Sequence, residues 1–594
     1  MEPFSTIGEI VDYVENHFDN PKALNYQHEG TWKHVSTKEF VETVRKVAYG
    51  LIKIGMKPGD KVGILANSSA NWTIVDFAVI MAGGITVPLF ANLSDENFIF
   101  EVAQANIRYL FVEGHKQWQM YEEHYHLFQT VISFQKAISL ETKPEAEEAY
   151  EFSELVTIGD TFMQEKPGLL AKIASSIHAD DVATIVYTSG STGVPKGAEI
   201  THRNLVHLIQ FGNLNWSEND RYLSILPLAH IFARQLNYIM IAWGGSVYYL
   251  TELSGIAKAF REVNPTFMIV VPRLLEKIRT RISMQLSKEN YLKQWIAKKA
   301  FALAEDPDES FLKRYLYRPL AKLFVYRPIM KQFGNSFRMI FSGGAALDPK
   351  LETFFQHLGF PILQGWGLTE ASTATINLPT KNKIGTVGPP LPGVKIKIAE
   401  NGEILLSSPT VMKGFYRRRR ATEAAIDADG WLHTGDKGEI DKDGYLKITG
   451  RLKRKFKLST GEYVSPEKIE RLLRLHTLVD MAFVVGEGHS AAACLLFPDI
   501  EVVHRLKQEC QATDLTDEEF LESEEMQKQT QAIIDQVNGK INQWERIAYY
   551  RLILEPLSVE KGELTPSTMK IRREVVLDKY HDLIESIYER EEVA

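Results

Sequence analysis

Residues 182–197, VATIVYTSGSTGVPKG, join an apolar run rich in β-branched residues to a loop of glycines and hydroxyl side chains. The run predicts a buried β-strand, and the glycines predict a loop directly after it. Gly190, Gly193 and Gly197 permit positive φ and a close approach of the backbone to a ligand. The side chains that add hydrogen-bond donors are Thr188, Ser189, Ser191, Thr192 and Lys196. We therefore expect a strand that ends in a polyphosphate-binding loop.

Two other interpretations of this stretch are less favourable. A P-loop requires a Gly-Lys-Ser/Thr after four intervening residues, but counting from Gly190 the second glycine position holds Pro195. A solvated Gly/Ser linker rarely follows so apolar a strand. We therefore expect a phosphate-binding loop that is not a P-loop.

The length of the chain requires more than one domain, because one hydrophobic core rarely supports more than about 250–300 residues and this chain has 594. In its first part, predicted strands at 61–67 and 108–114 alternate with predicted helices at 38–54 and 72–84. This alternation is typical of a layered α/β domain.

The remaining sequence predicts two further units. Residues from about 384 to 450 form short strands separated by Gly/Asp turns, which indicates a β-rich subdomain within a large domain at 1–450. A basic run then begins at Arg451 and marks a boundary between two bodies. Ser465 and Pro466 open a helix in the part that follows, where residues 454–594 are expected to form a small α+β domain.

Composition limits the classes of partner and compartment. A formal net charge of −8 argues against a dedicated nucleic-acid binder, so we expect no nucleic acid as partner. Cys494 and Cys510 are not in a CxxC pattern, which predicts neither a disulfide framework nor a structural metal site. The N-terminal residues lack the pattern of a signal peptide, and no apolar run reaches the roughly 18 residues of a membrane span. We expect a cytoplasmic protein.

Three later segments repeat the pattern of a strand followed by a small-residue turn or a polar end. They are SILPLAHIF at 224–232, FRMIFSGGAA at 337–346 and PILQGWGLTE at 361–370. His230 ends the first apolar run, where an imidazole can help to line a pocket. Trp366 is a flat aromatic between two glycines that can stack on a base, although such a residue is often simply part of a core.

Together these blocks resemble the adenylate-forming superfamily of acyl-CoA synthetases, luciferases and non-ribosomal adenylation domains, and the resemblance spans nearly the whole chain. It implies that the loop at 187–197, containing Thr188 to Gly193 and Lys196, binds the ATP phosphates. It implies a nucleotide site completed by Gly343, Gly344, Ala345, Trp366, Gly367, Thr369, Asp436, Arg451 and Lys570. It also implies catalytic roles for Lys570, Lys196, Thr369 and Glu370, with Mg²⁺ at Glu370 and Thr188.

The same resemblance implies the remaining parts of the enzyme. An acyl pocket would contain His230, Phe232 and Trp243, with a depth that depends on how Trp216, Phe232, Tyr238 and Trp243 pack. The small domain would be mobile about a hinge at 451–453, with Lys453 as hinge residue, and a CoA tunnel would include Ser459, Thr460 and Gly461.

Segments at 271–278 (VPRLLEKI), 457–470 and 564–573 resemble long-chain fatty acyl-CoA synthetases most. The resemblance therefore implies an AMP-forming ligase that uses ATP, Mg²⁺ and CoA to convert a medium- or long-chain fatty acid into acyl-CoA through acyl-AMP. Alternatives are a fatty acyl-AMP ligase that loads a carrier protein, a non-catalytic nucleotide-binding protein and, more remotely, a luciferase-type oxygenase. Against the first, residues 324–341 leave no room for the extra segment of such ligases.

Four consecutive arginines at 417–420 and the basic run at 451–457 are compatible with three interpretations. They can attract the phosphates of CoA, or contact an anionic membrane peripherally, or form an ordinary solvated surface. The sequence alone carries no signal for oligomeric state.

Overall fold

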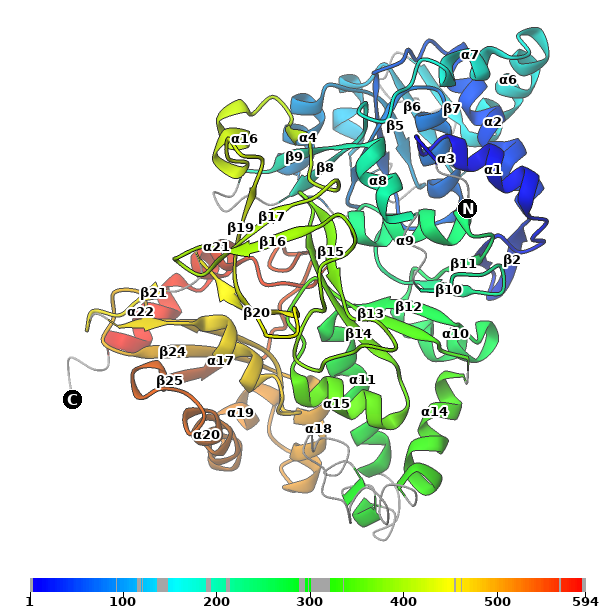
Figure 1. Ribbon diagram of the computed structural model, residues 1–594. Helices are drawn as coiled ribbons and strands as arrows, with labels where there is room; N and C mark the ends of the chain where they lie inside the picture. Colours follow the sequence, from blue (N-terminus) through cyan, green and yellow to red (C-terminus); the bar gives the residue numbers. More distant parts are fainter. Residues whose placement is uncertain are drawn as a thin grey trace.

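The computed structural model describes residues 4–589 apart from 92, 94, 115–118, 120, 136–147, 189–193, 210–213, 288–293, 297–298, 301–320, 335, 453–455, 461 and 566–567. Two eight-stranded sheets dominate the large domain (Figure 1). The first has the order β15-β14-β13-β12-β10-β11-β1-β2. Its strands are β1 (Leu24–His28), β2 (Thr31–Val35), β10 (Arg221–Ser224), β11 (Ser246–Tyr249), β12 (Phe267–Val270), β13 (Met339–Ser342), β14 (Ile362–Leu368) and β15 (Ser372–Ile376).

The second sheet has the order β18-β9-β8-β4-β3-β5-β6-β7. Its strands are β3 (Lys61–Leu65), β4 (Ile85–Leu89), β5 (Ile107–Val112), β6 (Thr130–Ser133), β7 (Glu148–Glu151), β8 (Val182–Thr188), β9 (Lys196–Thr201) and β18 (Gly414–Phe415). Both sheets are parallel in their interior and antiparallel at one edge or both, as at β14–β15 and β8–β9. Parallel strands buried on both faces explain the continuous apolar runs of the sequence.

Helices between the two sheets form the main core. They are α2 (Thr37–Lys53), α3 (Ala70–Met81), α8 (His202–Ile209) and α9 (Ile231–Ala242). A capping box of Ser36 and Glu39 starts α2 close to the predicted position. All but one of the residues of α3 are buried, as expected of a helix that is apolar on every side. The predicted helices at 38–54 and 72–84 are thus confirmed.

Helices α1 (Glu9–His17), α6 (Phe152–Glu165) and α7 (Leu169–Ala174) extend the main core by packing on the helices between the sheets, and α16 (Arg419–Ala425) packs beside β18 and β19. The helices on the other faces of the sheets are α4 (Asp95–Ala105), α10 (Ile256–Val263), α11 (Pro272–Ser287), α14 (Arg327–Phe333) and α15 (Pro349–Leu358). A second core joins α10, α11, α14 and α15 to the outer face of the first sheet. A further one packs α4 against the second sheet.

The β-rich part of the large domain is a four-stranded antiparallel sheet of β16 (Lys395–Ile398), β17 (Glu403–Ser407), β19 (Leu432–Ile440) and β20 (Leu446–Arg451). It precedes the small domain, whose strands are β21 (Phe456–Lys457), β22 (Tyr463–Val464), β23 (Val479–Val485), β24 (Ala492–Pro498) and β25 (Ile547–Leu552). The predicted fold class, a large multilayer α/β domain followed by a small α+β domain, is confirmed.

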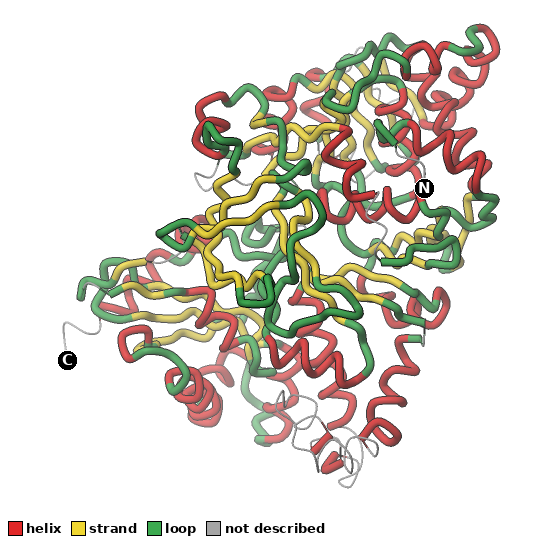
Figure 2. Tube along the Cα trace, in the orientation of Figure 1, coloured by secondary structure: helices red, strands yellow, loops and turns green. Residues whose placement is uncertain are grey.

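The small domain is a three-stranded sheet between two groups of helices (Figure 2). The first group is α17 (Pro466–Leu473), α18 (Ile500–Glu509), α19 (Asp517–Glu522) and α20 (Glu524–Asn538), and the second is α21 (Arg573–Lys579) and α22 (His581–Glu589). Alternate residues of β23 point into the two cores, as with Phe483 and Val484. No helix in the described ranges is long and apolar enough to cross a membrane.

Candidate active site

The antiparallel pair β8–β9 holds the two ends of the predicted phosphate loop together. Thr188 and Lys196 are register partners, and the Thr188 hydroxyl lies 3.4 Å from the carbonyl oxygen of Lys196. The loop residues Ser189, Gly190, Ser191, Thr192 and Gly193 lie outside the described residues. Lys196 Nζ lies 5.4 Å from the ring centroid of Phe415 in β18. The strand predicted before the loop is confirmed.

Gly197 serves packing rather than a special backbone conformation. Gly197 does not use the positive φ that glycine permits, since it is not among the described glycines in that region. A Cβ atom at this position would lie 2.7 Å from Ile185 Cγ2 and 3.2 Å from Tyr187 Cζ. Only a glycine therefore allows β9 to approach β8 so closely at the base of the loop.

Trp366, Asp436 and Arg451 form one hydrogen-bonded cluster between β14, β19 and β20. The indole Nε1 of Trp366 donates to Asp436 Oδ2 at 2.9 Å, and Arg451 Nε lies 2.7 Å from Asp436 Oδ1. The Asp436 side chain is 6% exposed, so both of its oxygens are held in place by these partners. The structure thus brings together three of the residues expected in the nucleotide site.

Glu370 lies in the turn between β14 and β15, beside Thr369, and its carbonyl accepts a hydrogen bond from the Met412 amide at 2.7 Å. Burial raises the pKa of the Glu370 carboxyl, and the charges of Arg451 and Lys196 oppose that rise. Asp436 adds a repulsion that raises the pKa further. Two cations and two carboxylates thus lie close enough to act on one another.

Gly367 is required by the geometry of β14. The register shifts between Trp366 and Gly367, and a Cβ atom on Gly367 would lie 1.8 Å from the carbonyl oxygen of Ser372. The β-bulge formed there sets the direction in which the chain continues to Thr369 and Glu370.

His230 is the N-cap residue of α9. Its Nδ1 accepts a hydrogen bond from the Phe232 amide at 3.2 Å, so the neutral ring carries its proton on Nε2. Burial, with a smaller contribution from the charge of Lys570, lowers the pKa of His230 to about 4. The ring is therefore neutral at pH 7, and Lys570 of the small domain lies within electrostatic reach of it.

A contact between glycine and threonine places the Lys570 loop of the small domain against the large domain. Leu564 and Ile571 pair at the base of the loop that carries Lys570. Gly344, at φ +79°, approaches that loop so closely that a Cβ atom on it would lie 3.2 Å from Thr568 Cγ2. Gly343 approaches Phe232 in the same way, at 3.1 Å from Cε1. Ala345 follows in the same turn after β13.

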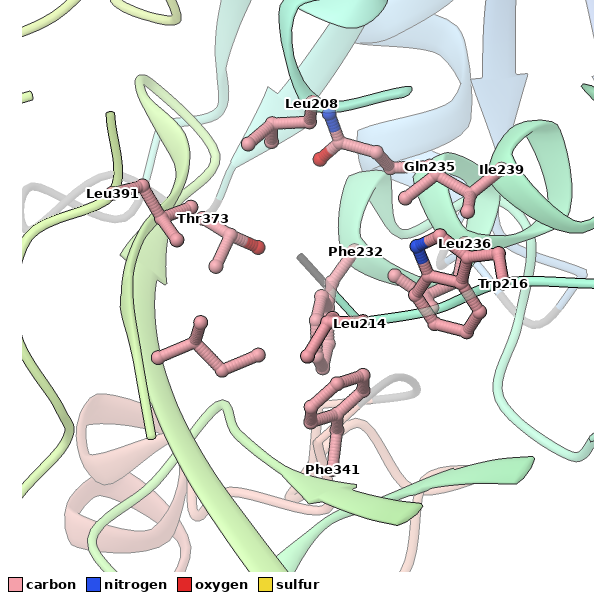
Figure 3. A pocket seen from close by; sticks show the side chains of 11 residues that line it. Leu208, Leu214, Trp216, Phe232, Gln235, Leu236, Ile239, Phe341, Thr373 and Leu391 are labelled. Carbon is pink, nitrogen blue, oxygen red and sulfur yellow. The ribbon is translucent and has the colours of Figure 1, made fainter. Parts of the chain in front are cut away.

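An apolar cavity of about 40 Å³ lies between α9 and β15 (Figure 3). Its lining residues are Leu208, Leu214, Trp216, Phe232, Gln235, Leu236, Ile239, Phe341, Thr373, Ile376 and Leu391. Pockets for drug-sized ligands usually occupy about 300–1,000 Å³, so a long acyl chain requires these side chains to move apart.

The cavity includes one of the three residues expected in the acyl pocket. Phe232 lines it, together with Trp216, whereas His230 and Trp243 are not among its lining residues. Trp243 ends α9, and its Nε1 donates to the carbonyl oxygen of Ile209 at 3.3 Å. Tyr238 also points elsewhere, donating to Asp76 Oδ2. Gln235, Leu236 and Ile239 also line the cavity, although no motif in the sequence singles them out. Their only signal is helical spacing, which puts them on the same face of α9 as Phe232.

The structure describes only part of the predicted hinge and CoA tunnel. Lys453 and Gly461 lie outside the described residues. Ser459 and Thr460 form the turn between β21 and β22, and the Ser459 amide donates to the carbonyl oxygen of His489 at 2.9 Å.

The residues of this site fit Mg²⁺ bound through a single carboxylate. No cluster of three or more His, Cys, Asp or Glu side chains that could hold a metal occurs in the part of the chain that the structure describes. Mg²⁺ commonly binds through one or two carboxylates and completes its shell with water and substrate phosphates. The Glu370 carboxylate, near Lys196 at the edge of the phosphate loop, fits that mode.

Comparisons with known proteins identify the family of the chain. Residues 13–416 match the family model described as AMP-binding enzyme, and residues 454–592 match the one described as AMP-binding enzyme C-terminal domain. Long-chain-fatty-acid–CoA ligase FadD15 of Mycobacterium tuberculosis is 31% identical, with 99% of each chain covered. Long chain acyl-CoA synthetase 4 of Arabidopsis thaliana is 30% identical over 93% of this chain and 86% of its own length.

Solved structures share the fold at lower identity. The A domain of carboxylic acid reductase from Segniliparus rugosus, in complex with AMP and a co-purified carboxylic acid, superposes with a TM-score of 0.78 at 19% identity. That alignment covers 99% of this chain and 94% of the reductase domain. Since a family model spans most of the chain and curated relatives align along nearly all of it, the protein belongs to the AMP-binding enzymes of the adenylate-forming superfamily, among the long-chain fatty acid–CoA ligases.

Proposed function

We propose that the protein is an AMP-forming ligase that converts a medium- or long-chain fatty acid into acyl-CoA in two steps. The observation that carries the proposal is that the Lys570 loop meets the large domain, with Thr568 against Gly344 and the Lys570 charge acting on His230, while the charges of Lys196 and Arg451 act on Glu370. An apolar cavity lies behind the same site, lined by Phe232. A cationic centre next to an apolar cavity suits a substrate with an anionic head and an apolar tail.

In the first step a carboxylate oxygen attacks the α-phosphorus of ATP. The new O–P bond forms as the bond to the β-phosphate oxygen breaks, and pyrophosphate leaves with the electron pair. A fatty acid has a pKa of about 4–5 and is already ionised at pH 7, so no general base is required. The obstacle is repulsion between anions, which Lys196, Lys570 and Arg451 offset. Mg²⁺, held by Glu370 and the Thr188 hydroxyl, would supply further positive charge to the phosphates.

Neutral His230 suits this step because it adds no competing charge beside Lys570. Its Nδ1 is occupied by the Phe232 amide, which leaves Nε2–H as a donor toward the substrate. Trp366, Gly343, Gly344 and Ala345 are assigned to the adenine, whereas Asp436 is assigned to the ribose.

In the second step the CoA thiolate attacks the acyl carbonyl carbon. The C–S bond forms, the C–O bond to the phosphate breaks, and AMP leaves. The step requires the small domain to turn about the proposed hinge at 451–453, so that Ser459, Thr460 and Gly461 line a path for CoA. The domain limits 1–450 and 454–594 are part of this proposal.

The test is release of AMP by the purified protein with ATP, Mg²⁺, CoA and straight-chain acids from acetate to oleate. CoA-dependent AMP release that rises with chain length, with acyl-CoA identified by mass spectrometry, is expected. Accumulation of acyl-AMP regardless of CoA would instead indicate an acyl-AMP ligase. Absence of AMP with every acid would indicate a non-catalytic protein.

The arginines at 417–420 are proposed to contact an anionic membrane that delivers the fatty acid. The Arg419 side chain is 91% exposed, and the Arg418 guanidinium lies 5.8 Å from the ring of Phe100 on α4. Ile99, also on α4, is 40% exposed, so charge and apolar surface occur together. Flotation with liposomes should depend on anionic lipid at physiological salt and should weaken in R418Q/R420Q. Flotation that does not depend on lipid charge would leave the arginines as a solvated surface.

A further inference from the structure

Helix α11 carries three charged side chains at intervals of three residues, Arg273, Glu276 and Arg279. The first two belong to the VPRLLEKI segment of the sequence, to which the proposed chemistry assigns no role. Side chains at this spacing lie along one side of a helix. All three find partners in the small domain.

The contacts form one chain of alternating charge, which we call the interdomain ion-pair chain: Asp480, Arg273, Glu276 and Arg474. Arg273 binds Asp480 of β23 through Nη2, and its Nη1 lies 3.4 Å from Glu276 Oε2. Arg474, directly after α17, reaches the same Glu276 oxygen at 3.4 Å. One turn further along α11, Arg279 Nη1 donates to the carbonyl oxygen of Leu475 at 3.3 Å.

These groups are largely shielded from solvent. The exposed fractions of the side chains are 9% for Arg273, 12% for Glu276, 22% for Asp480 and 24% for Arg474. Partly buried pairs are screened less by salt than surface pairs, and their attraction depends steeply on geometry. The chain therefore favours one orientation of the two domains over others.

Asp480 is connected rigidly to the loop that carries Lys570. Its neighbour Met481 and the next inward residue, Phe483, pack in the same core as Leu564, and Ile571 packs against that core. Leu564 and Ile571 are the two residues that pair at the base of the Lys570 loop. Fixing β23 against α11 therefore also fixes where Lys570 meets the large domain.

We propose that the interdomain ion-pair chain positions Lys570 for adenylation and separates when the small domain turns for thioester formation. Arg273, Glu276, Asp480 and Arg474 are thus positioning residues, and the inference rests on the proposed two-step function. Charged partners suit a contact that must open, because each can be hydrated once apart, whereas an apolar contact of the same size would resist opening.

The test measures the two half-reactions separately in D480N, R273Q and the double variant. One assay follows acyl-AMP formation from ATP and a fatty acid without CoA, and the other follows thioester formation from supplied acyl-AMP and CoA. Each single variant should lower the rate of acyl-AMP formation about tenfold, the usual size of a coupling between two sites. The rate of thioester formation should be unchanged or higher. The double variant should be no slower than the slower single variant.

R45Q is the matched control. Arg45 is also a partly buried arginine with two carboxylate partners, Asp12 and Glu15, but all three belong to the large domain. This variant should affect both half-reactions to the same small extent. If D480N is too unstable to assay, R474Q should give the same separation of the two rates.

Equal loss in both half-reactions, no loss in either, or additive losses in the double variant would overturn the proposed positioning role. Failure of the proposed function is distinguishable, because the wild-type protein would then form either no acyl-AMP or acyl-AMP that it does not convert to thioester with CoA.

Discussion

An ion pair in the centre of the main core gives the sharpest prediction about stability. Arg234 of α9 and Asp76 of α3 are 0% and 1% exposed, with Arg234 Nε 2.8 Å from Asp76 Oδ2. Arg234 Nη1 also donates to the Thr184 hydroxyl of β8 at 2.7 Å. The pair thus ties the helix that begins after His230 to the strand that leads into the phosphate loop.

Removing one partner leaves the other charge buried without compensation, which typically costs about 3–5 kcal/mol. We therefore expect R234M to lower the free energy of unfolding of the large domain by about 4 kcal/mol. The double variant D76N/R234M leaves no uncompensated charge, and its loss should be much smaller than the sum of the two single losses.

Urea unfolding followed by tryptophan fluorescence is a suitable assay, because the Trp72 ring lies 5.4 Å from the Arg234 guanidinium. R203M is the control, since Arg203 pairs with Asp180 on the surface, with exposed fractions of 55% and 75%. Its effect on the free energy of unfolding should be small, because an exposed ion pair contributes little to stability. A loss below about 1 kcal/mol in R234M, or additive losses in the double variant, would refute the reasoning.

Three further predictions concern the site. The free energy of unfolding of G197A in urea should be about 1–3 kcal/mol lower and its KM for ATP should rise, because the added Cβ would lie 2.7 Å from Ile185 Cγ2. An unchanged KM would show that the packing of β9 does not determine the position of the phosphate loop. The folded pKa of His230 is about 4 and its ordinary value is 6.5, so the unfolded state binds the proton more readily than the folded state. The free energy of unfolding should therefore fall by about 3 kcal/mol as the pH falls from 6.5 to 4. H230Q should flatten that part of the profile of unfolding free energy against pH. Burial raises the pKa of the Glu370 carboxyl, and Mg²⁺-dependent ATP binding needs its ionised form. As the pH is lowered, this binding should therefore weaken at a higher pH than it would with an exposed glutamate. E370Q should show a high KM for MgATP at every pH, and a wild-type pH dependence in E370Q would exclude Glu370 as its source.

The sequence predicts elements best where the pattern is local. The apolar period and the capping residues of α2 give its ends to within one residue, and α3, in which only Asn71, Thr73 and Asp76 are polar, is correctly predicted as a buried helix. Boundaries without such signals move: the strand predicted at 61–67 is found at Lys61–Leu65, and the strand predicted at 108–114 is found at Ile107–Val112. Pairing with the neighbouring strands determines these limits instead.

Long-range partners could not be predicted from the sequence. Arg234 and Asp76 are 158 positions apart, and Arg273 and Asp480 are 207 apart, so only the fold brings them together. The cavity shows the same limit, since four aromatic residues were equal candidates and only Trp216 and Phe232 line it. Successive side chains of α9 are rotated by about 100° around the helix axis, so Phe232 faces the cavity whereas Tyr238 faces Asp76.

The role of Lys570 is the central claim, and rapid-quench measurement of the two half-reactions in K570A tests it most directly. We expect acyl-AMP formation to fall by about 10²–10³, the usual effect of losing one group that stabilises the transition state. Thioester formation from supplied acyl-AMP and CoA should remain close to the wild-type rate. Equal loss of both half-reactions, or full retention of adenylation, would contradict the arrangement in which the Lys570 loop meets the large domain as the adenylating state.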